Sequence, residues 1–171
     1  VSEEGKGTVF TVELTLKIDK TYEDEKEEVQ KREEEISISG MHILVVEDNE
    51  LNLEIETYML EEQGVLVTPA KDGTEAVELF AKSEIGEFDL ILMDIMMPRM
   101  NGYEAAEAIR KMERKDAGEI PIFAVSANAF LDDIAASKKS GMNEHLSKPI
   151  DFDEMMKRIG EYRKKVERNR S

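Results

Sequence analysis

The chain has 171 residues, a formal net charge of −16 and no cysteine. This length suits one domain of ordinary size with an appendage. The acidic charge and the lack of a long basic run argue against direct contact with nucleic acid or an anionic membrane surface. The missing cysteines exclude disulfides and thiolate metal sites, and no apolar stretch approaches the ~20 residues that span a bilayer.

The chain begins with Val1, and no signal peptide is recognisable. We interpret it as a fragment of a longer protein. A reduced, cytoplasmic setting is expected for this fragment, with no direct membrane contact of its own, whereas the parent protein could be anchored in a membrane.

Residues 1–18 predict a strand. After Gly5-Lys6-Gly7-Thr8, apolar and polar residues alternate strictly, which is typical of a strand with one buried face. The apolar face consists of Phe10, Val12, Leu14, Leu16 and Ile18. An alternative is that this segment is an edge strand of the following domain. The glycine spacing does not match a phosphate-binding P-loop.

Residues 19–40 predict a linker. Residues 19–35 carry almost no apolar side chains, which indicates a solvated and at most transiently helical segment. Residues 36–40 lead into the main domain, which we expect to span 41–171.

From Met41 onwards, strand and helix patterns alternate. Five apolar runs predict strands, at 42–46, 65–67, 90–93, 120–125 and 145–147. Helical spacing marks the segments between and after them, through the sets Leu51/Ile55/Tyr58/Met59, Ala76/Leu79/Phe80, Ala105/Ala108/Ile109/Met112, 128–140 and Phe152/Met155/Met156/Ile159. Five such pairs predict an α/β fold, a parallel sheet with helices on both faces.

Asp94 is the central candidate for a reactive group. It ends the apolar run Leu90–Met93, and Pro98 and Gly102 then mark a loop. A carboxylate at that point would be costly as a core residue. It is better placed at the mouth of a parallel sheet, where the carboxyl ends of the strands line a crevice.

Other polar residues also fall at strand ends. Glu47 and Asp48 follow the first strand, Ser126 ends the fourth and Lys148 follows the fifth. With the strand order 2-1-3-4-5, these ends are neighbours along one edge of the sheet. Taken singly, each has an ordinary explanation as a helix cap, a turn residue or a solvated side chain. Their joint placement favours a site.

Three crowded carboxylates must share a proton or bind a cation. Mg²⁺ prefers oxygen ligands and suits one or two carboxylates together with a phosphoryl oxygen. Ser126 offers a hydroxyl and Lys148 a positive charge, and both groups can hold phosphoryl oxygens. We interpret Met96, Met97 and Met100 as residues that pack within the loop, and not as a metal or cofactor site.

Four motifs resemble a response-regulator receiver domain. These are Val-Val-Glu-Asp-Asn, Leu-Met-Asp-Ile-Met-Met-Pro-Arg-Met-Asn-Gly, Val-Ser-Ala-Asn-Ala and Leu-Ser-Lys-Pro-Ile. They occur in the family's order and are most similar to receivers fused to hybrid sensor histidine kinases. The segment Gly-Lys-Gly-Thr-Val-Phe-Thr-Val-Glu-Leu-Thr-Leu resembles the end of a histidine kinase ATP-binding domain. The resemblance implies a three-layer (βα)5 flavodoxin-like fold with an extra N-terminal strand segment.

The resemblance also implies roles for individual residues. Asp94 accepts a phosphoryl group from a phosphohistidine, and Lys148 pairs with the phosphoryl oxygens. Mg²⁺ is held by Glu47, Asp48, Asp94 and the backbone carbonyl of Met96. Ser126 moves to the phosphoryl group, the Lys148–Pro149 bond is cis, and the aromatic switch position falls on His145. A histidine there differs from the usual tyrosine or phenylalanine and makes that surface sensitive to pH.

The expected function is therefore phosphoacceptance in a two-component phosphorelay. The implied partners are the phosphohistidine domain of a histidine kinase and a histidine phosphotransfer protein. A homodimer is a further state that the sequence allows. The fragment lacks a complete kinase domain, although its parent is expected to be a histidine protein kinase. Residues 1–18 are expected to be the remnant of the ATP-binding domain.

The sequence fits three other functions less well. A Mg²⁺-dependent phosphatase with an aspartate nucleophile needs an acid two residues after Asp94, where Met96 stands. A flavodoxin-like mononucleotide binder needs a phosphate loop after the first strand, where Glu47-Asp48-Asn49 would repel phosphate. A scaffold that is never phosphorylated would not need the acid, serine and lysine set, but only labelling excludes it.

The lifetime of the phosphoryl group is expected to depend on the residues that could admit or orient water. These are Met96 and Asn128, which lie two positions after Asp94 and Ser126. Met96 is apolar and Asn128 is not a general base, so slow self-dephosphorylation is predicted.

Overall fold

The computed structural model describes residues 2–3, 7–8, 37–127 and 131–170. The chain divides into two units, Val1–Glu35 and Ile36–Ser171. In the first unit, β1 (Ser2–Glu3) pairs with β2 (Gly7–Thr8) in an antiparallel arrangement. The alternating strand predicted at 10–18 lies outside the described residues.

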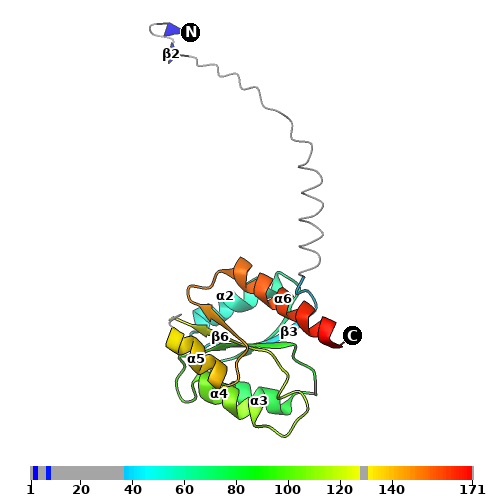
Figure 1. Ribbon diagram of the computed structural model, residues 1–171. Helices are drawn as coiled ribbons and strands as arrows, with labels where there is room; N and C mark the ends of the chain where they lie inside the picture. Colours follow the sequence, from blue (N-terminus) through cyan, green and yellow to red (C-terminus); the bar gives the residue numbers. More distant parts are fainter. Residues whose placement is uncertain (1, 4–6, 9–36, 128–130, 171) are drawn as a thin grey trace. The chain divides into compact units, whose positions relative to one another are not determined.

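The second unit is built on a five-stranded parallel sheet (Figure 1). Its strand order is β4-β3-β5-β6-β7, which confirms the predicted order 2-1-3-4-5. The strands are β3 (His42–Val46), β4 (Leu66–Ala70), β5 (Leu90–Asp94), β6 (Ile122–Ser126) and β7 (Glu144–Ser147).

The second strand differs most from its prediction. β4 begins at Leu66 and continues through Pro69 to Ala70, whereas the apolar pattern stopped at Val67. Proline lacks the N–H that a central strand needs, but β4 is an edge strand of the sheet, where proline is tolerated. Its outer residues are partly exposed, so the apolar signal there is weak.

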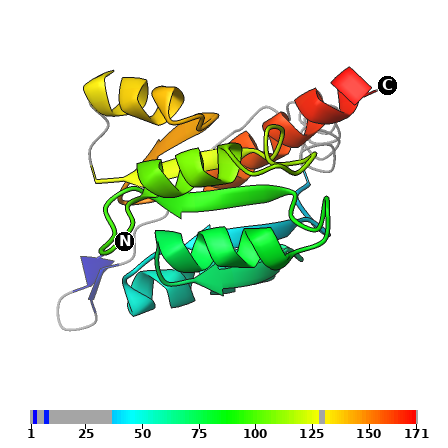
Figure 2. The ribbon, with the colours of Figure 1, turned by 90° about the horizontal axis from the view of Figure 1, so that it is seen from below.

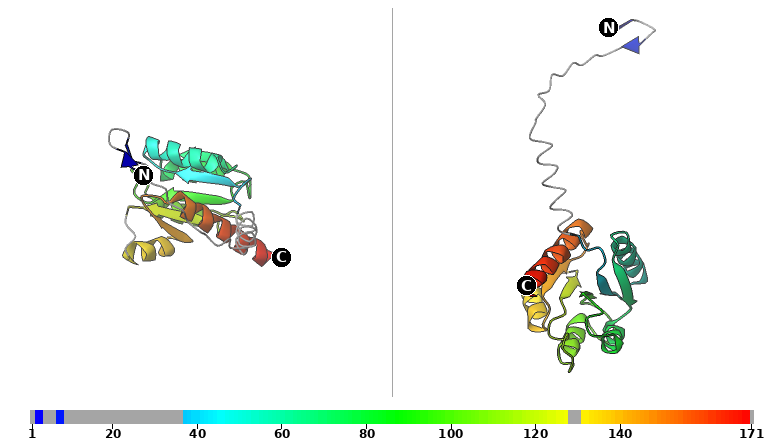
Figure 3. Two further views of the ribbon diagram at one scale, coloured as in Figure 1. Left: turned by 90° about the horizontal axis from the view of Figure 1, so that it is seen from above. Right: turned by 90° about the vertical axis from the view of Figure 1, so that its right-hand side faces the viewer.

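Helices cover both faces of the sheet. Figure 1 shows α2 and α6 on one face and α3 and α4 on the other, while Figure 2 looks onto the α3–α4 side and the left view of Figure 3 onto the α2–α6 side. The helices are α2 (Glu50–Glu61), α3 (Gly73–Lys82), α4 (Gly102–Arg110), α5 (Leu131–Lys139) and α6 (Phe152–Arg170). This arrangement is the predicted three-layer fold.

Two apolar cores lie on opposite sides of the sheet. Leu44 and Ile91 face the core beneath α3 and α4, whereas Ile43 and Leu92 face the core beneath α2 and α6. Successive residues of a strand point to opposite faces, and both faces are covered here. The central strands are therefore unbroken apolar runs.

Side-chain caps fix where three helices begin. Asn49, Asp72 and Asn101 each accept hydrogen bonds from backbone N–H groups of the first turn of α2, α3 and α4, respectively. Asn101 and Glu104 form a capping box. α4 ends at Arg110, so Met112, which was expected to mark this helix, lies beyond it.

α2 turns an apolar stripe away from the core. Leu51, Ile55 and Tyr58 are 65%, 45% and 59% exposed, although their spacing correctly predicted a helix. The buried residues of α2 are instead Leu53, Glu56 and Leu60. The helix therefore has apolar residues on two faces, and only one of them is covered by the sheet.

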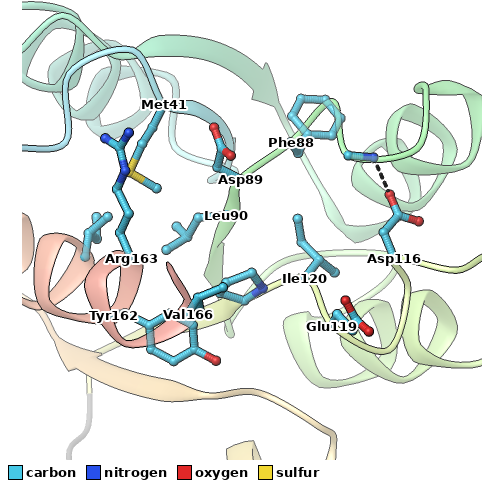
Figure 4. A pocket seen from close by; sticks show the side chains of 13 residues that line it. Met41, Phe88, Asp89, Leu90, Asp116, Glu119, Ile120, Tyr162, Arg163 and Val166 are labelled. Carbon is cyan, nitrogen blue, oxygen red and sulfur yellow. Dashed lines mark hydrogen bonds between the residues drawn. The ribbon is translucent and has the colours of Figure 1, made fainter. Parts of the chain in front are cut away.

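The two ends of the parallel strands carry different features. At the amino-terminal ends of the strands, α6 and the loop before β6 enclose a pocket of about 220 Å³ with an apolar floor and the carboxylates of Asp89, Asp116 and Glu119 around it (Figure 4). The carboxyl ends of the strands hold the polar residues singled out by the sequence.

Within the described residues, no helix has the length and apolar character to cross a membrane.

Candidate functional site

The carboxyl ends of β3 and β5 and the loop after β7 bring three charged side chains together. The Lys148 ammonium lies 2.5 Å from Glu47 Oε2 and 2.5 Å from Asp94 Oδ2. Glu47 and Asp94 are only 1% and 5% exposed. Asp48 is exposed, and one oxygen from each of Glu47, Asp48 and Asp94 lies within 4.8 Å of the others.

Asp94 is held at the centre of this cluster. Its Oδ1 accepts a hydrogen bond from the Met96 N–H at 3.0 Å, and its Oδ2 accepts one from Lys148. Gly102, the first residue of α4, passes directly against this position, since a Cβ there would lie 2.3 Å from the Asp94 carbonyl oxygen. A glycine is therefore required where the loop closes on the end of β5.

Glu47 has a full set of donors. Its Oε1 accepts hydrogen bonds from the Asn52 side-chain amide at 3.1 Å and from the Asn49 N–H at 3.3 Å. Its Oε2 accepts one from Lys148. The first turn of α2 thus orients this carboxylate towards the end of β5.

The environment drives the pKa values of the two buried carboxyl groups apart. Burial raises the pKa of Asp94, and the negative charge of Glu47 adds to this, against the lowering effect of Lys148. Burial also raises the pKa of Glu47, but the hydrogen bonds from Lys148 and Asn52 outweigh it and leave that pKa lowered. Of these two carboxyl groups, Asp94 is therefore the one that binds a proton more readily.

Lys148 stays protonated despite its position. Burial alone lowers the pKa of Lys148, but its hydrogen bonds to Asp94 and Glu47 have the larger combined effect and raise it. The site therefore keeps one fixed positive charge among three carboxylates.

Ser126 ends β6, as expected, but its side chain bonds to His145. Ser126 Oγ lies 2.9 Å from His145 Nε2, and His145 Nδ1 lies 2.9 Å from Ser137 Oγ in α5. The backbone stays close to the site, since the Lys148 N–H donates to the Ser126 carbonyl at 2.7 Å. His145 therefore links the end of β6 to α5.

Two of the remaining predicted residues, Met96 and Pro149, closely follow the strand ends of this centre. Met96 is 75% exposed on the loop after β5. The Lys148–Pro149 peptide bond is cis. Asn128 lies outside the described residues.

Three contributors were not singled out from the sequence. Asn52 donates to Glu47, and Glu56 is buried near the cluster on the inner face of α2. Arg99 has a positive φ of 66° and forms an ion pair with Asp72, the N-cap of α3, which fastens the loop after β5. Asn52 lies in the first turn of α2, close in sequence to Glu47, and this proximity is the signal from which it could have been found. The Arg99–Asp72 pair joins distant segments and leaves no local signal.

A five-stranded parallel sheet in this order, with acidic residues and a lysine at its carboxyl edge, defines a receiver-type α/β domain. Residues 43–160 match the model of the response regulator receiver domain, and the chain belongs to that family. Hybrid signal transduction histidine kinase I of Dictyostelium discoideum is 38% identical over an alignment of 147 residues that covers 80% of this chain and 8% of that protein. Histidine kinase 1 of Arabidopsis thaliana is 34% identical over an alignment of 153 residues that covers 72% of this chain and 13% of that protein.

The chain thus spans a small part of the kinases it resembles, and there it matches their receiver domains. Two solved receiver domains are similar in structure. That of the sensor histidine kinase PA1611 from Pseudomonas aeruginosa, with a magnesium ion in its active-site cleft, is 36% identical with a TM-score of 0.63, covering 71% of this chain and 95% of that one. The receiver domain of Ssk1 from Saccharomyces cerevisiae, in complex with the phosphotransfer protein Ypd1, is 31% identical with a TM-score of 0.63. The match covers 70% of this chain and 86% of that one.

Proposed function

We propose that Asp94 is the phosphoacceptor of this receiver domain. A carboxylate oxygen of Asp94 attacks the phosphorus of a phosphohistidine, the P–N bond breaks and its electron pair leaves with the imidazole, and an acyl phosphate forms on Asp94. The observation that carries this proposal is the position of Asp94, which is buried at the central strand end between the Met96 N–H and the Lys148 ammonium.

The three acids are not equivalent in this role. Glu47 already accepts hydrogen bonds from Asn49, Asn52 and Lys148, so its oxygens are engaged in holding the site. Asp48 is exposed at the rim. Asp94 has one oxygen on a backbone N–H and one on Lys148, so a move of Lys148 to an incoming phosphoryl oxygen frees a nucleophilic oxygen.

The donor set at this edge fits Mg²⁺. Glu47, Asp48 and Asp94 offer oxygens within 4.8 Å of one another, and the backbone carbonyl of Met96 is the fourth ligand we propose. When bound, Mg²⁺ neutralises the crowded acids and polarises the phosphoryl group. The same carboxylates then no longer require Lys148 as their only counter-charge, and Lys148 becomes available to the phosphoryl oxygens.

We propose that Ser126 and His145 couple phosphorylation of Asp94 to a conformational change. In the tautomer in which the Ser126 hydroxyl donates to His145 Nε2, Ser126 must give up this hydrogen bond before it can donate to a phosphoryl oxygen. His145 is also bonded to Ser137, so this rearrangement reaches α5. We propose that phosphorylation shifts the population between these two arrangements.

We propose that the donor is the phosphohistidine domain of a histidine kinase and that the acceptor is a histidine phosphotransfer protein, in a cytoplasmic setting. The similarity to hybrid histidine kinases and to a receiver that binds Ypd1 supports these partners. Within the parent kinase, residues 1–18 would end the ATP-binding domain and 41–171 would form the receiver, with 19–40 as the linker whose last residues, including Ile38, pack onto the receiver core.

Intact-protein mass spectrometry tests the chemistry. The chain is incubated with acetyl phosphate and Mg²⁺, which dispenses with any partner. We expect one added phosphoryl group, its loss when EDTA removes Mg²⁺, and no label on Asp94→Asn. Asp153→Asn, which removes an exposed acid from α6, is the matched control and should label like the parent. Equal labelling of Asp94→Asn and the parent would show that Asp94 is not the acceptor.

A further inference from the structure

A pocket lies beside the acidic site, between α2 and the segment that follows β7. It is open and has a volume of about 450 Å³. α2 contributes Asn52, Ile55 and Glu56, and the facing wall includes Lys148, Ile150 and Phe152. Lys148 belongs to both the pocket and the site, so the two are contiguous.

Glu56 is the unusual residue of this pocket. Only 5% of it is exposed, and its carboxylate has no hydrogen bond or ion pair with any part of the chain that the structure describes. Among those same residues, every side-chain oxygen or nitrogen that is sealed from solvent has a partner. The oxygens of Glu56 therefore keep some contact with solvent, and Glu56 is one of the residues that line the pocket. A largely buried carboxylate without a hydrogen-bond donor or cation beside it raises the free energy of the folded protein. The pocket therefore lacks a group that would pair with Glu56.

The two side-chain donors that line the pocket together with Glu56 are used elsewhere. The Lys148 ammonium binds Glu47 and Asp94, each at 2.5 Å, and the Asn52 amide donates to Glu47. Burial raises the pKa of Glu56 to about 7, and the charge of Glu47 contributes to this rise. A positive group in the pocket would offset both effects.

We propose that this pocket receives the ammonium or guanidinium group of a basic side chain from the protein that exchanges its phosphoryl group with Asp94, and that this group pairs with Glu56. The proposal rests on the phosphoacceptor function argued above. Ile55, Ile150 and Phe152 offer an apolar lining for the methylene stem of a lysine or arginine, while the charged end meets the carboxylate.

The surface around the pocket fits a protein partner with these properties. Ile55 also belongs to the exposed stripe of Leu51, Ile55 and Tyr58, so the pocket opens next to an apolar face. Residues 50–61 of α2 include four glutamates and no basic residue, and the whole chain has a net charge of −16. Charge complementarity therefore calls for an apolar partner surface with a basic side chain.

The test uses the full chain, unphosphorylated and without Mg²⁺, so that its outcome is independent of Asp94 labelling. The probe is Nα-acetyl-arginine amide, and the isosteric but uncharged Nα-acetyl-citrulline amide is its control. The chain carries ¹³C-labelled glutamate, and the Glu56 carboxyl signal is assigned by its loss in Glu56→Gln. Sodium chloride at equal ionic strength controls for screening.

We expect the arginine probe to bind in the millimolar range, to lower the pH midpoint of Glu56 and to shift the methyl signals of Ile55 and Ile150 saturably. The citrulline probe should bind at least ~10-fold more weakly, since it lacks the charge that Glu56 recognises. Glu54→Gln, which removes an exposed charge from the same helix, should leave probe binding unchanged. Equal binding of the two probes, an unchanged Glu56 midpoint, or equal binding to Glu56→Gln would each overturn the proposal.

Discussion

Charge balance governs the site at the residue scale. Glu47 and Asp94 share Lys148 as their counter-charge, while Glu56 is buried nearby without such a partner among the described residues. The two situations have opposite consequences. The paired acids hold the site together, whereas ionisation of Glu56 opposes folding.

The first prediction concerns Glu56 and pH. Its pKa is raised from 4.5 to about 7, so the folded state is fully favoured while Glu56 is protonated and loses stability as the pH rises through that window. Glu56→Gln removes this cost. We expect the variant to be more stable than the parent at pH 8, by at most about 3 kcal/mol, and this gain to disappear below about pH 4.5. Urea unfolding across this pH range measures it.

The control for this prediction is Glu54→Gln, because Glu54 is exposed on the same helix. Its difference from the parent should stay within about 0.5 kcal/mol at every pH. A Glu56→Gln effect that does not vary with pH would mean that ionisation of Glu56 is not its cause.

Met96 provides a second test at this scale. Its side chain is 75% exposed at the rim of the site, so replacing it should not disturb the core. An amide can orient a water molecule that a thioether cannot. We expect Met96→Asn to speed loss of the phosphoryl group about 10-fold, equivalent to about 1.4 kcal/mol of barrier. The decay of the phosphorylated chain in Mg²⁺ without a partner gives the rate, and identical decay of parent and variant would remove Met96 from this role.

At the scale of elements, the start of α4 fixes the end of β5. Gly102 lies so close to Asp94 that a methyl group there would meet the Asp94 carbonyl oxygen at 2.3 Å and Ile95 Cα at 2.9 Å. Both contacts are with backbone, which has little freedom to move. The position of Asp94 therefore depends on a glycine eight residues later in the chain.

We accordingly expect Gly102→Ala to destabilise the domain by about 1–3 kcal/mol and to slow labelling of Asp94 by acetyl phosphate. Gly118→Ala is the matched control, because a methyl group at Gly118 meets nothing within 4 Å. Thermal unfolding and the labelling rate, measured on both variants, separate a local effect from a general one. Equal behaviour of the two variants would contradict the close approach at Gly102.

At the scale of the whole molecule, the chain consists of two units with a boundary after Glu35. Ile38 and Met41, which precede the first strand of the sheet, are each 4% exposed and belong to the core beneath α2 and α6. Arg163 of α6 also donates to the carbonyls of Ser37 and Ser39. The receiver unit therefore needs residues that precede β3.

Two deletions test this boundary. Removal of residues 1–35 should change the unfolding free energy by no more than about 0.5 kcal/mol and leave Asp94 labelling intact. Removal of residues 1–40 also deletes Ile38 and should cost about 1.5–3 kcal/mol, the value of burying one large apolar side chain. Urea unfolding of both chains measures the difference. A large loss from the shorter deletion would place part of residues 1–35 within the receiver fold.

Much of this architecture was predictable from the sequence. Strands that are buried on both faces are unbroken apolar runs, and their alternation with helical patterns permits few topologies. The receiver motifs then fixed the strand order, because they matched a family with a known fold. Asp94, Glu47, Asp48 and Lys148 stood out because they fall at the carboxyl ends of several strands, which this topology brings together.

Only the tertiary structure decided which face of α2 is covered. Both of its faces carry apolar residues at helical spacing, so the sequence pattern was equally consistent with burial of Leu51, Ile55 and Tyr58 or of Leu53 and Leu60. The sheet and α6 cover the second set, which also buries Glu56. Packing likewise determined the bond between Ser126 and His145, which lie 19 residues apart. Contacts of this kind depend on how distant segments meet in space, and a local pattern of residues does not record that.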